Sequence, residues 1–461
     1  MQALRSPEKR RKEARRSRER PRLPWGELAI YLLGVGVGAL DTSILPPVLG
    51  QIARDFHVSL AWAAWTLTAY TVAYAASTPV MGALGDRIGH VRVFRAGVAA
   101  FGLASVLAVL SPNLAVFLLA RVIQGAGAGA VYPNAQAEGI ALFPPERRGT
   151  ALGIFGAVFG LASVIAPNLG GVLGQYFRWP SVFLLNLPLV LIVLWRAHGL
   201  RPGGRSDRPL PDVPAAAAFS GGLALFLLAL TVQGTPGRVL GAGSVVVLAL
   251  FLLRQRRTPV PFLDMAPLLQ ASGVALVAGS AVIGFDLSAS ALVPTMVQKE
   301  FDFSVLASGV AMMPAAVTGA LLAGLAGVLV DRAGPRPVLQ GGLGLAVVGS
   351  ILMAWPHLDL PRFVAAMALL GAATAFTMGA SINRLALALY GEGQAGEALS
   401  LVAVFRSVGM AAGPVLLGLA ASAGNFTGMF AGVALASLAG VVLFGLVRGG
   451  AAGTAGVAAG R

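Results

Sequence analysis

Long apolar stretches recur along the whole 461-residue chain, separated by short segments that carry charges or proline, glycine and asparagine. Each stretch is about 20 residues long, which is the length an α-helix needs to cross the hydrocarbon core of a bilayer. Because such stretches recur from Leu28 onward, the first one is not a cleavable signal peptide. The pattern predicts fourteen spanning helices, centred near residues 38, 72, 102, 125, 161, 189, 223, 246, 282, 317, 346, 376, 408 and 436.

The composition agrees with an all-α integral membrane protein. Hydrophobic residues make up 56% of the chain and charged residues only 11%, and the mean hydropathy is +0.79. A protein in water could not bury so much apolar surface, so the bilayer must be its solvent. The chain has no cysteine, which excludes disulfides and thiolate metal sites. We expect no intramembrane metal site, because all four histidines lie at span ends or in loops: His57, His90, His198 and His357.

The net charge of +15 could indicate a nucleic-acid partner, but its distribution along the chain argues against one. If the N-terminus is cytoplasmic, 26 of the 34 Lys and Arg residues fall in cytoplasmic loops and tails, and only five fall in outside loops. This asymmetry predicts that both termini lie in the cytoplasm. We expect the chain to sit in the inner (plasma) membrane. We interpret the basic tail, residues 1–24, as a topology signal that also contacts anionic lipid.

Two segments of the chain repeat each other. "GALGDRIGHVRVF" begins at Gly82 and "GVLVDRAGPRPVL" begins at Gly327, 245 residues later. The same offset relates Asp41 to Asp286, the acid within the ninth span. Two halves in the same orientation are typical of parallel-repeat transporters. We therefore predict an N-terminal six-helix half (25–198), a linker with an extra two-helix hairpin outside the repeat (199–258), a C-terminal six-helix half (259–447) and a tail (448–461).

Further motifs accompany the repeat in order. "LLARVIQGAGAGA" lies in the fourth span, "GIFGAVFGLASVIAPNLGG" in the fifth, and "FRWPSVFLLNLP" follows it. With these motifs the chain resembles the major facilitator superfamily, and within it the fourteen-helix drug–proton antiporter branch. The resemblance implies two six-helix halves with two extra central helices, alternating access, a small-molecule substrate, and a proton gradient in place of any cofactor. We expect a monomer in the lipid bilayer.

The stretch "GVGALDTSILPPVLG" places an acid, Asp41, shortly before two prolines, Pro46 and Pro47. A charge at mid-bilayer costs about 2.5–3.5 kcal/mol on insertion scales, so it indicates a functional site by default. The prolines bend the helix and free carbonyl groups, which only protein or water can satisfy there. We expect Asp41 to face a wet central cavity and to exchange the proton that drives transport. The alternative is a structural acid paired with Arg121.

Three residues are candidates for proton coupling: Asp41, Arg121 and Asp286. The guanidinium of Arg121 stays charged, so it is either an ion-pair partner or a regulator of a nearby acid. Asp286 is the repeat counterpart of Asp41, with a polar contact between helices as its structural alternative. Arg384 and Arg406 also lie within spans, where they line the cavity or extend toward a span end.

The resemblance assigns the remaining candidates to three groups. The cytoplasmic gate motif comprises Gly82, Asp86, Arg87, Gly89, Gly327, Asp331, Arg332 and Gly334. The antiporter motif of the fifth span comprises Gly153, Pro167, Gly170 and Gly171. The candidate lining of a substrate cavity comprises Trp65, Gln124, Tyr132, Phe155, Asn168, Asn383 and Arg406, each of which is individually more often a packing residue.

These observations lead to an expected function. We expect a secondary transporter, not an enzyme, that exports apolar, cationic or neutral drug-like molecules in exchange for protons. The alternative on the same scaffold is an exporter of one endogenous metabolite, such as a siderophore or a lipid precursor. A non-transporting membrane sensor is a further alternative, but a sensor usually adds a soluble output domain.

Overall fold

The computed structural model confirms the all-α class. Every regular element among the described residues is a helix. The predicted tails, residues 1–24 and 448–461, and residues 201–211 of the predicted linker region lie outside the described part of the chain. The structure describes residues 25–144, 148–200, 212–232, 234–259, 270–378, 380–390 and 395–446.

All fourteen predicted span centres fall within helices. The N-terminal half consists of α2 (Trp25–Ile44), the 3-10 turn η1 (Pro46–Val48), α3 (Leu49–Asp55), α4 (Leu60–Ile88), α5 (His90–Val109), α6 (Leu114–Ala141), α7 (Arg148–Phe177) and α8 (Pro180–Ala197). The extra hairpin consists of α9 (Val213–Thr231) and α10 (Gly234–Gln255). The C-terminal half consists of α11 (Ala271–Ala289), η4 (Ser290–Leu292), α12 (Val293–Glu300), α13 (Val305–Val310), α14 (Met313–Ala333), α15 (Pro335–Met353), α16 (Leu360–Thr377), α17 (Ala380–Tyr390), α18 (Ala395–Ser422) and α19 (Phe426–Leu446).

Most of these helices have the dimensions of membrane spans. Within the described residues, 12 helical segments are long and apolar enough to cross a bilayer. The other two predicted spans correspond to α4 and α7, which are 29 and 30 residues long. Threonine and serine residues interrupt the apolar sequence of α4 and lower its hydropathy. The chain is therefore a multi-pass membrane protein.

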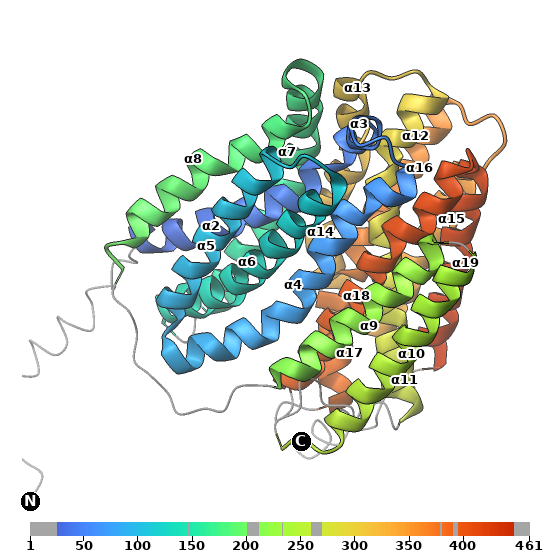
Figure 1. Ribbon diagram of the computed structural model, residues 1–461. Helices are drawn as coiled ribbons and strands as arrows, with labels where there is room; N and C mark the ends of the chain where they lie inside the picture. The colour runs from blue at the N-terminus through green and yellow to red at the C-terminus, as the bar shows by residue number, and fades with distance from the viewer. Residues whose placement is uncertain are drawn as a thin grey trace, which may run out of the picture.

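The two halves meet at one end of the molecule, where α3, α12 and α13 lie, and diverge away from it (Figure 1). We call this the contact end. There Gln298 Nε2 donates to the carbonyl of Pro47 (2.9 Å), which joins α12 to η1. The amide of Ala61, at the start of α4, donates to Ser422 Oγ at the end of α18 (3.1 Å). These bonds connect the ends of helical elements from opposite halves.

The extra hairpin covers the line of contact between α4 and α18, which we call the seam. Leu227 of α9 is fully buried in a cluster that also contains Trp65 of α4 and Val415 of α18. In contrast, α10 exposes apolar side chains such as Val245 and Leu250. Exposed apolar side chains on a spanning helix face lipid. The hairpin thus packs on the outside of both halves.

The repeat extends to local backbone geometry. In the first half α2 ends at Ile44 and is followed by a 3-10 turn, and 245 residues later α11 ends at Ala289 and is followed by one as well. The turn η1 contains Pro46 and Pro47, but η4 has the sequence Ser-Ala-Leu. Proline is therefore not the only cause of the break, since the second half makes it without one.

Candidate functional site

Asp41 lies in the last turn of α2 and is completely buried. Its Oδ2 accepts a hydrogen bond from Arg121 Nη1 of α6 at 2.6 Å, and its Oδ1 accepts one from Asn186 Nδ2 of α8 at 3.1 Å. Protein donors therefore engage both carboxylate oxygens. The expectation that Asp41 faces water is wrong for this conformation, because an arginine and an amide stand where a wet cavity was expected. The paired alternative is what the structure contains.

Arg121 is held on several sides. Its Nε donates to the carbonyl of Thr66 at 2.9 Å, and its Nη1 also donates to Gln124 Oε1 at 2.7 Å. The guanidinium lies over the ring of Tyr70, 4.5 Å from its centroid, and 5.7 Å from that of Phe183. Such contacts offset the cost of removing a cation from water.

Ser105 completes this site. Ser105 Oγ of α5 accepts from Gln124 Nε2 at 2.9 Å and from Asn186 Nδ2 at 3.4 Å. We call Asp41, Ser105, Arg121, Gln124 and Asn186 the Asp41 network, which joins four helices of the N-terminal half. The sequence-based selection included neither Ser105 nor Asn186. Asn186 carried a signal, since it is the single side-chain amide in the apolar sequence of α8, whereas a lone serine such as Ser105 carries none.

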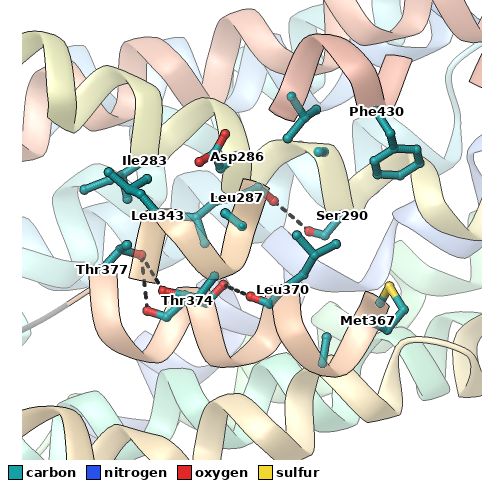
Figure 2. Close-up of a pocket in the computed structure, with 15 residues that line it drawn as sticks. Ile283, Asp286, Leu287, Ser290, Leu343, Met367, Leu370, Thr374, Thr377 and Phe430 are labelled. Carbon is teal, nitrogen blue, oxygen red and sulfur yellow. Dashed lines mark hydrogen bonds between the residues drawn. The ribbon is translucent and has the colours of Figure 1, made fainter. Parts of the chain in front are cut away.

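Asp286 occupies the equivalent place in the C-terminal half, with different surroundings. Its Oδ2 accepts from Ser437 Oγ of α19 at 2.9 Å, and its buried Oδ1 has no hydrogen-bond partner among the described residues. Asp286 lines a cavity of about 70 Å³ together with Ser290, Thr374 and Thr377 (Figure 2). A space of this size can hold water. The second half therefore contains an acid without an arginine.

The threonine hydroxyls of this cavity bond to their own helix. Thr374 Oγ1 donates to the carbonyl of Leu370 at 3.0 Å, and Thr377 Oγ1 donates to that of Ala373 at 2.9 Å (Figure 2). The remainder of the lining is mostly apolar and includes Leu343 and Phe430. Among the described residues that line this cavity, Asp286 is thus the one ionisable group.

The glycines that end the gate motifs have a backbone geometry that suits glycine. Gly89 ends α4 with φ +101°, and Gly334 ends α14 with φ +83°. A side chain is strained at such angles. Of the other gate glycines, Gly82 packs near Pro133, and the space around Gly327 is open. The repeated glycines thus allow the tight turns between α4 and α5 and between α14 and α15.

The charged gate residues form different pairs in the two halves. Asp86 contacts His90 Nε2 at 3.3 Å, and His90 Nδ1 lies 2.8 Å from Asn134 Oδ1 of α6. Asp331 pairs with Arg384 Nη2 of α17 at 2.9 Å, and both side chains are more than half exposed. Arg384 therefore lies in an exposed ion pair at the end of α14 rather than in a cavity wall. The neighbouring basic residues, Arg87 and Arg332, lie in the last turns of α4 and α14.

The antiporter-motif residues lie where α7 approaches other helices. A side chain at Gly170 would collide with the carbonyl of Ile44 at the end of α2, and one at Gly171 would meet Leu306 of α13. A side chain at Gly309 of α13 would in turn collide with the carbonyl of Pro167. Small residues allow this close approach between membrane helices. The motif thus packs the N-terminal half against α13 of the C-terminal half. Gly153 lies in α7, but its surroundings fall outside the described side chains.

The seven candidate cavity residues do not form one group. Trp65 Nε1 donates to Thr231 Oγ1 of α9 at 3.1 Å, so it faces the hairpin. Phe155 is fully buried beside Gly139, and Asn168 bonds to the carbonyl of Val164 in its own helix. Gln124 belongs to the Asp41 network. Three half-buried residues remain: Tyr132 of α6, Asn383 of α17 and Arg406 of α18.

Two like halves of membrane-spanning helices, joined at one end and holding buried charges in corresponding helices, define a secondary-transporter architecture. A family profile described as "Major Facilitator Superfamily" matches residues 31–414 and 274–456. The chain therefore belongs to the major facilitator superfamily.

Similar proteins agree with this assignment. The chain is 32% identical over 347 residues to the tetracenomycin C resistance and export protein of Streptomyces glaucescens, covering 72% of this chain and 62% of that one. It is 30% identical to the puromycin resistance protein pur8 of Streptomyces alboniger, covering 86% and 81%. A crystal structure of a bacterial homologue of the human lysosomal transporter Spinster, inward-facing and unoccupied, has a TM-score of 0.64 at 17% identity, covering 93% and 96%. This last similarity supports the fold.

Proposed function

We propose that this protein is a proton-coupled antiporter that exports drug-like small molecules, with both termini in the cytoplasm and the chain in the plasma membrane. The observation that carries the proposal is the buried pair of Asp41 and Arg121, a proton-accepting group held next to a fixed cation inside a two-half transporter. The drug-resistance names of several relatives support export as the direction. The working unit is a monomer.

The Asp41 network suggests how proton binding changes the protein. Arg121 and Asn186 each donate a hydrogen bond to the Asp41 carboxylate. Protonation removes the charge that holds Arg121 and Asn186 in place, so these side chains can rearrange. If the two halves rock and admit water near α2, Asp41 can exchange its proton with one side and then with the other. A substrate that favours the ionised form is then exchanged for a proton.

The contact end gives the structure a direction under this proposal. With the termini in the cytoplasm, the bonds between Ala61 and Ser422 and between Gln298 and Pro47 lie on the outer side. The halves then diverge toward the cytoplasm, which is the arrangement that admits a substrate from inside the cell. A proton moving inward through 100 mV supplies about 2.3 kcal/mol to each cycle.

Asp286 is a second proton-coupling residue in this scheme. Its unpartnered Oδ1 is costly as a buried carboxylate oxygen, and a bound proton lowers that cost. Two acids permit more than one proton per cycle.

The test is transport by the purified protein in liposomes with an imposed pH gradient and an entrapped pH-sensitive dye. Puromycin and methyl viologen, which appear in the names of relatives, are the first compounds to add. Transport of either should release protons in proportion to substrate moved. The Asp41→Asn variant should lose uphill transport but keep downhill exchange, and Asp359→Asn, at the exposed start of α16, should behave as the wild type. Uphill transport by Asp41→Asn at the wild-type rate would make Asp41 structural and Asp286 the next candidate.

One relative favours a second candidate function, the transport of a single endogenous metabolite. The chain is 28% identical over 344 residues to the riboflavin transporter RibZ of Clostridioides difficile, covering 74% of this chain and 75% of that one. Riboflavin in the same liposome assay distinguishes the two. Saturable riboflavin transport with no response to puromycin or methyl viologen would favour a metabolite carrier.

A further inference from the structure

Arg406 is a cation in the middle of α18 that the Asp41 network does not use. It lies 11 residues after Ala395, so the helix rise places it about 16 Å from the start of the helix, beyond the reach of its side chain. Among the side chains that the structure describes, no carboxylate forms an ion pair with Arg406, and the ionisable side chains near it are the phenols of Tyr74 and Tyr132, which are neutral at pH 7. A fixed guanidinium at this depth is costly without a counter-charge.

The register of two helices places Arg406 and Tyr74 at a similar depth. The bond from Thr68 Oγ1 to the carbonyl of Ala411 (2.8 Å) fixes α4 against α18, and these helices run in opposite directions. Tyr74 is six residues along α4 from that bond, and Arg406 is five residues back along α18. The two residues therefore lie at the same level on facing halves.

The surroundings of Arg406 are rigid and aromatic. A side chain at Gly284 of α11 would collide with the Arg406 carbonyl, so this turn of α18 lies directly on α11. Across the interface, Tyr74 stacks on Tyr70 with centroids 6.4 Å apart, and Tyr132 OH accepts a hydrogen bond from Gln136 Nε2 at 3.3 Å. Tyr74, Tyr132 and Arg406 are each only partly buried although all three lie well within their helices.

We propose that Arg406, Tyr74 and Tyr132 form a binding subsite for a carboxylate carried on an aromatic substrate, a proposal that rests on the transport function given above. The guanidinium binds the carboxylate through charge-assisted hydrogen bonds, and the phenol rings pack against the aromatic part. The subsite spans both halves, so a bound substrate contacts each of them.

The subsite is also connected to the proton site. The ring of Tyr70, on which Tyr74 stacks, lies under the guanidinium of Arg121. A substrate ring placed against Tyr74 therefore extends a continuous stack that ends at the ion pair of Asp41. This gives the substrate a direct physical route to influence the residue that exchanges the proton.

The test uses two probes that differ only by esterification, tetramethylrhodamine with a free carboxylate and its methyl ester. Equilibrium binding to the full chain in lipid nanodiscs is measured by fluorescence polarisation at neutral pH and without a proton gradient. The Arg406→Gln variant should bind the carboxylate probe about tenfold more weakly, a change of about 1.4 kcal/mol, and the ester within twofold of the wild type. The affinity of Arg406→Lys for the carboxylate probe should lie between those of the wild type and Arg406→Gln. Arg362→Gln, an exposed arginine at the start of α16, is the matched control and should change neither affinity.

A second measurement uses the wild type alone, in case Arg406→Gln does not fold. Competition against the carboxylate probe should require less 2-naphthoate than 2-naphthamide, because these competitors differ only in the anionic group. Equal weakening of both probes in Arg406→Gln, no binding of the carboxylate probe to the wild type, or equal potency of the two competitors would overturn the subsite. Because no gradient is present, a failure of proton coupling in liposomes leaves these binding results unaffected, and the two proposals fail separately.

Discussion

The two intramembrane acids differ in how the protein compensates their burial. Asp41 has an arginine and an amide that each donate a hydrogen bond to one of its oxygens, whereas Asp286 has a single serine hydroxyl and an adjacent cavity. Removing one partner of a buried pair leaves an uncompensated charge, which costs more than removing both partners. Breaking the pair of Asp41 should therefore destabilise the N-terminal half. Asp286 has no such ion pair among the described residues, so its substitution should not carry this cost.

This difference predicts non-additive stability changes. Arg121→Gln should destabilise the protein strongly, by about 3–5 kcal/mol, because it leaves the Asp41 carboxylate buried beside neutral groups. Adding Asp41→Asn to that variant should recover part of the loss. Thermal unfolding of the purified single and double variants, followed by tryptophan fluorescence, measures the coupling between the two residues. Simple addition of the two single losses would contradict an interacting pair.

A second residue-scale prediction concerns Asp212, which precedes α9 outside the spans. Burial raises the pKa of its carboxyl. Hydrogen bonds from Arg254, Thr258 and the amide of Ala215 lower this pKa by more than burial raises it, so the pKa of Asp212 lies below its ordinary value. A lowered pKa stabilises the folded state above the ordinary value near 4, and this stability is lost as the pH falls through the folded pKa. The wild type should therefore unfold at a higher temperature than Asp212→Asn at pH 7, with the gap closing below about pH 4. If the unfolding temperatures of the wild type and Asp212→Asn differed by the same amount at pH 7 and pH 3, the ion pair of Asp212 would not be the source of the added stability.

At the scale of single elements, the sequence predicts helices well and their local partners less well. Apolar length alone places all fourteen spans, because the bilayer admits few backbone solutions. The double proline predicts the break after α2, but η4 makes the same break without proline, and only the repeat offset could have indicated it. Trp65 was selected for a cavity and faces the hairpin instead, because helix rotation depends on packing that no single-sequence pattern specifies.

The repeated glycines permit an element-scale test. Gly89→Ala and Gly334→Ala should each destabilise the protein by about 1–3 kcal/mol, since alanine is strained at their positive φ angles. Gly324→Ala is the matched control, because that glycine lies inside α14 with open space around it. Alanine there should be neutral or slightly stabilising. Thermal unfolding measures all three, and an equal effect at Gly324 would show that backbone strain is not the cause.

At the scale of the whole molecule, the contact end is the part that must separate if the halves rock. The sequence and its repeat predict that there are two halves, but not which ends touch, because both arrangements of an alternating-access protein use the same helices. The bonds of Ala61 with Ser422 and of Pro47 with Gln298 identify the closed end in this structure.

This closed end predicts a reversible lock. A Cβ at position 418 would lie 3.4 Å from the Cβ of Ala64, close to the spacing of a disulfide. The Ala64→Cys/Gly418→Cys variant of this cysteine-free chain should lose transport on oxidation and regain it on reduction. Each single variant serves as a control under the same oxidant. Full transport by the oxidised double variant, with the disulfide verified by mass, would mean that this end need not open.

The hairpin on the seam also limits the routes by which an apolar compound can enter the transporter from the bilayer. Such compounds accumulate within the bilayer and can approach a carrier sideways from either leaflet. Along α4 and α18 that approach is covered by α9, whose Leu227 is sealed into the packing of both helices. On the opposite flank α7 and α14 border each other, and lateral entry from the lipid would have to use that flank. The two extra helices thus make the two lipid-facing flanks of the transporter different, with the flank of α4 and α18 covered and the flank of α7 and α14 not covered by the hairpin.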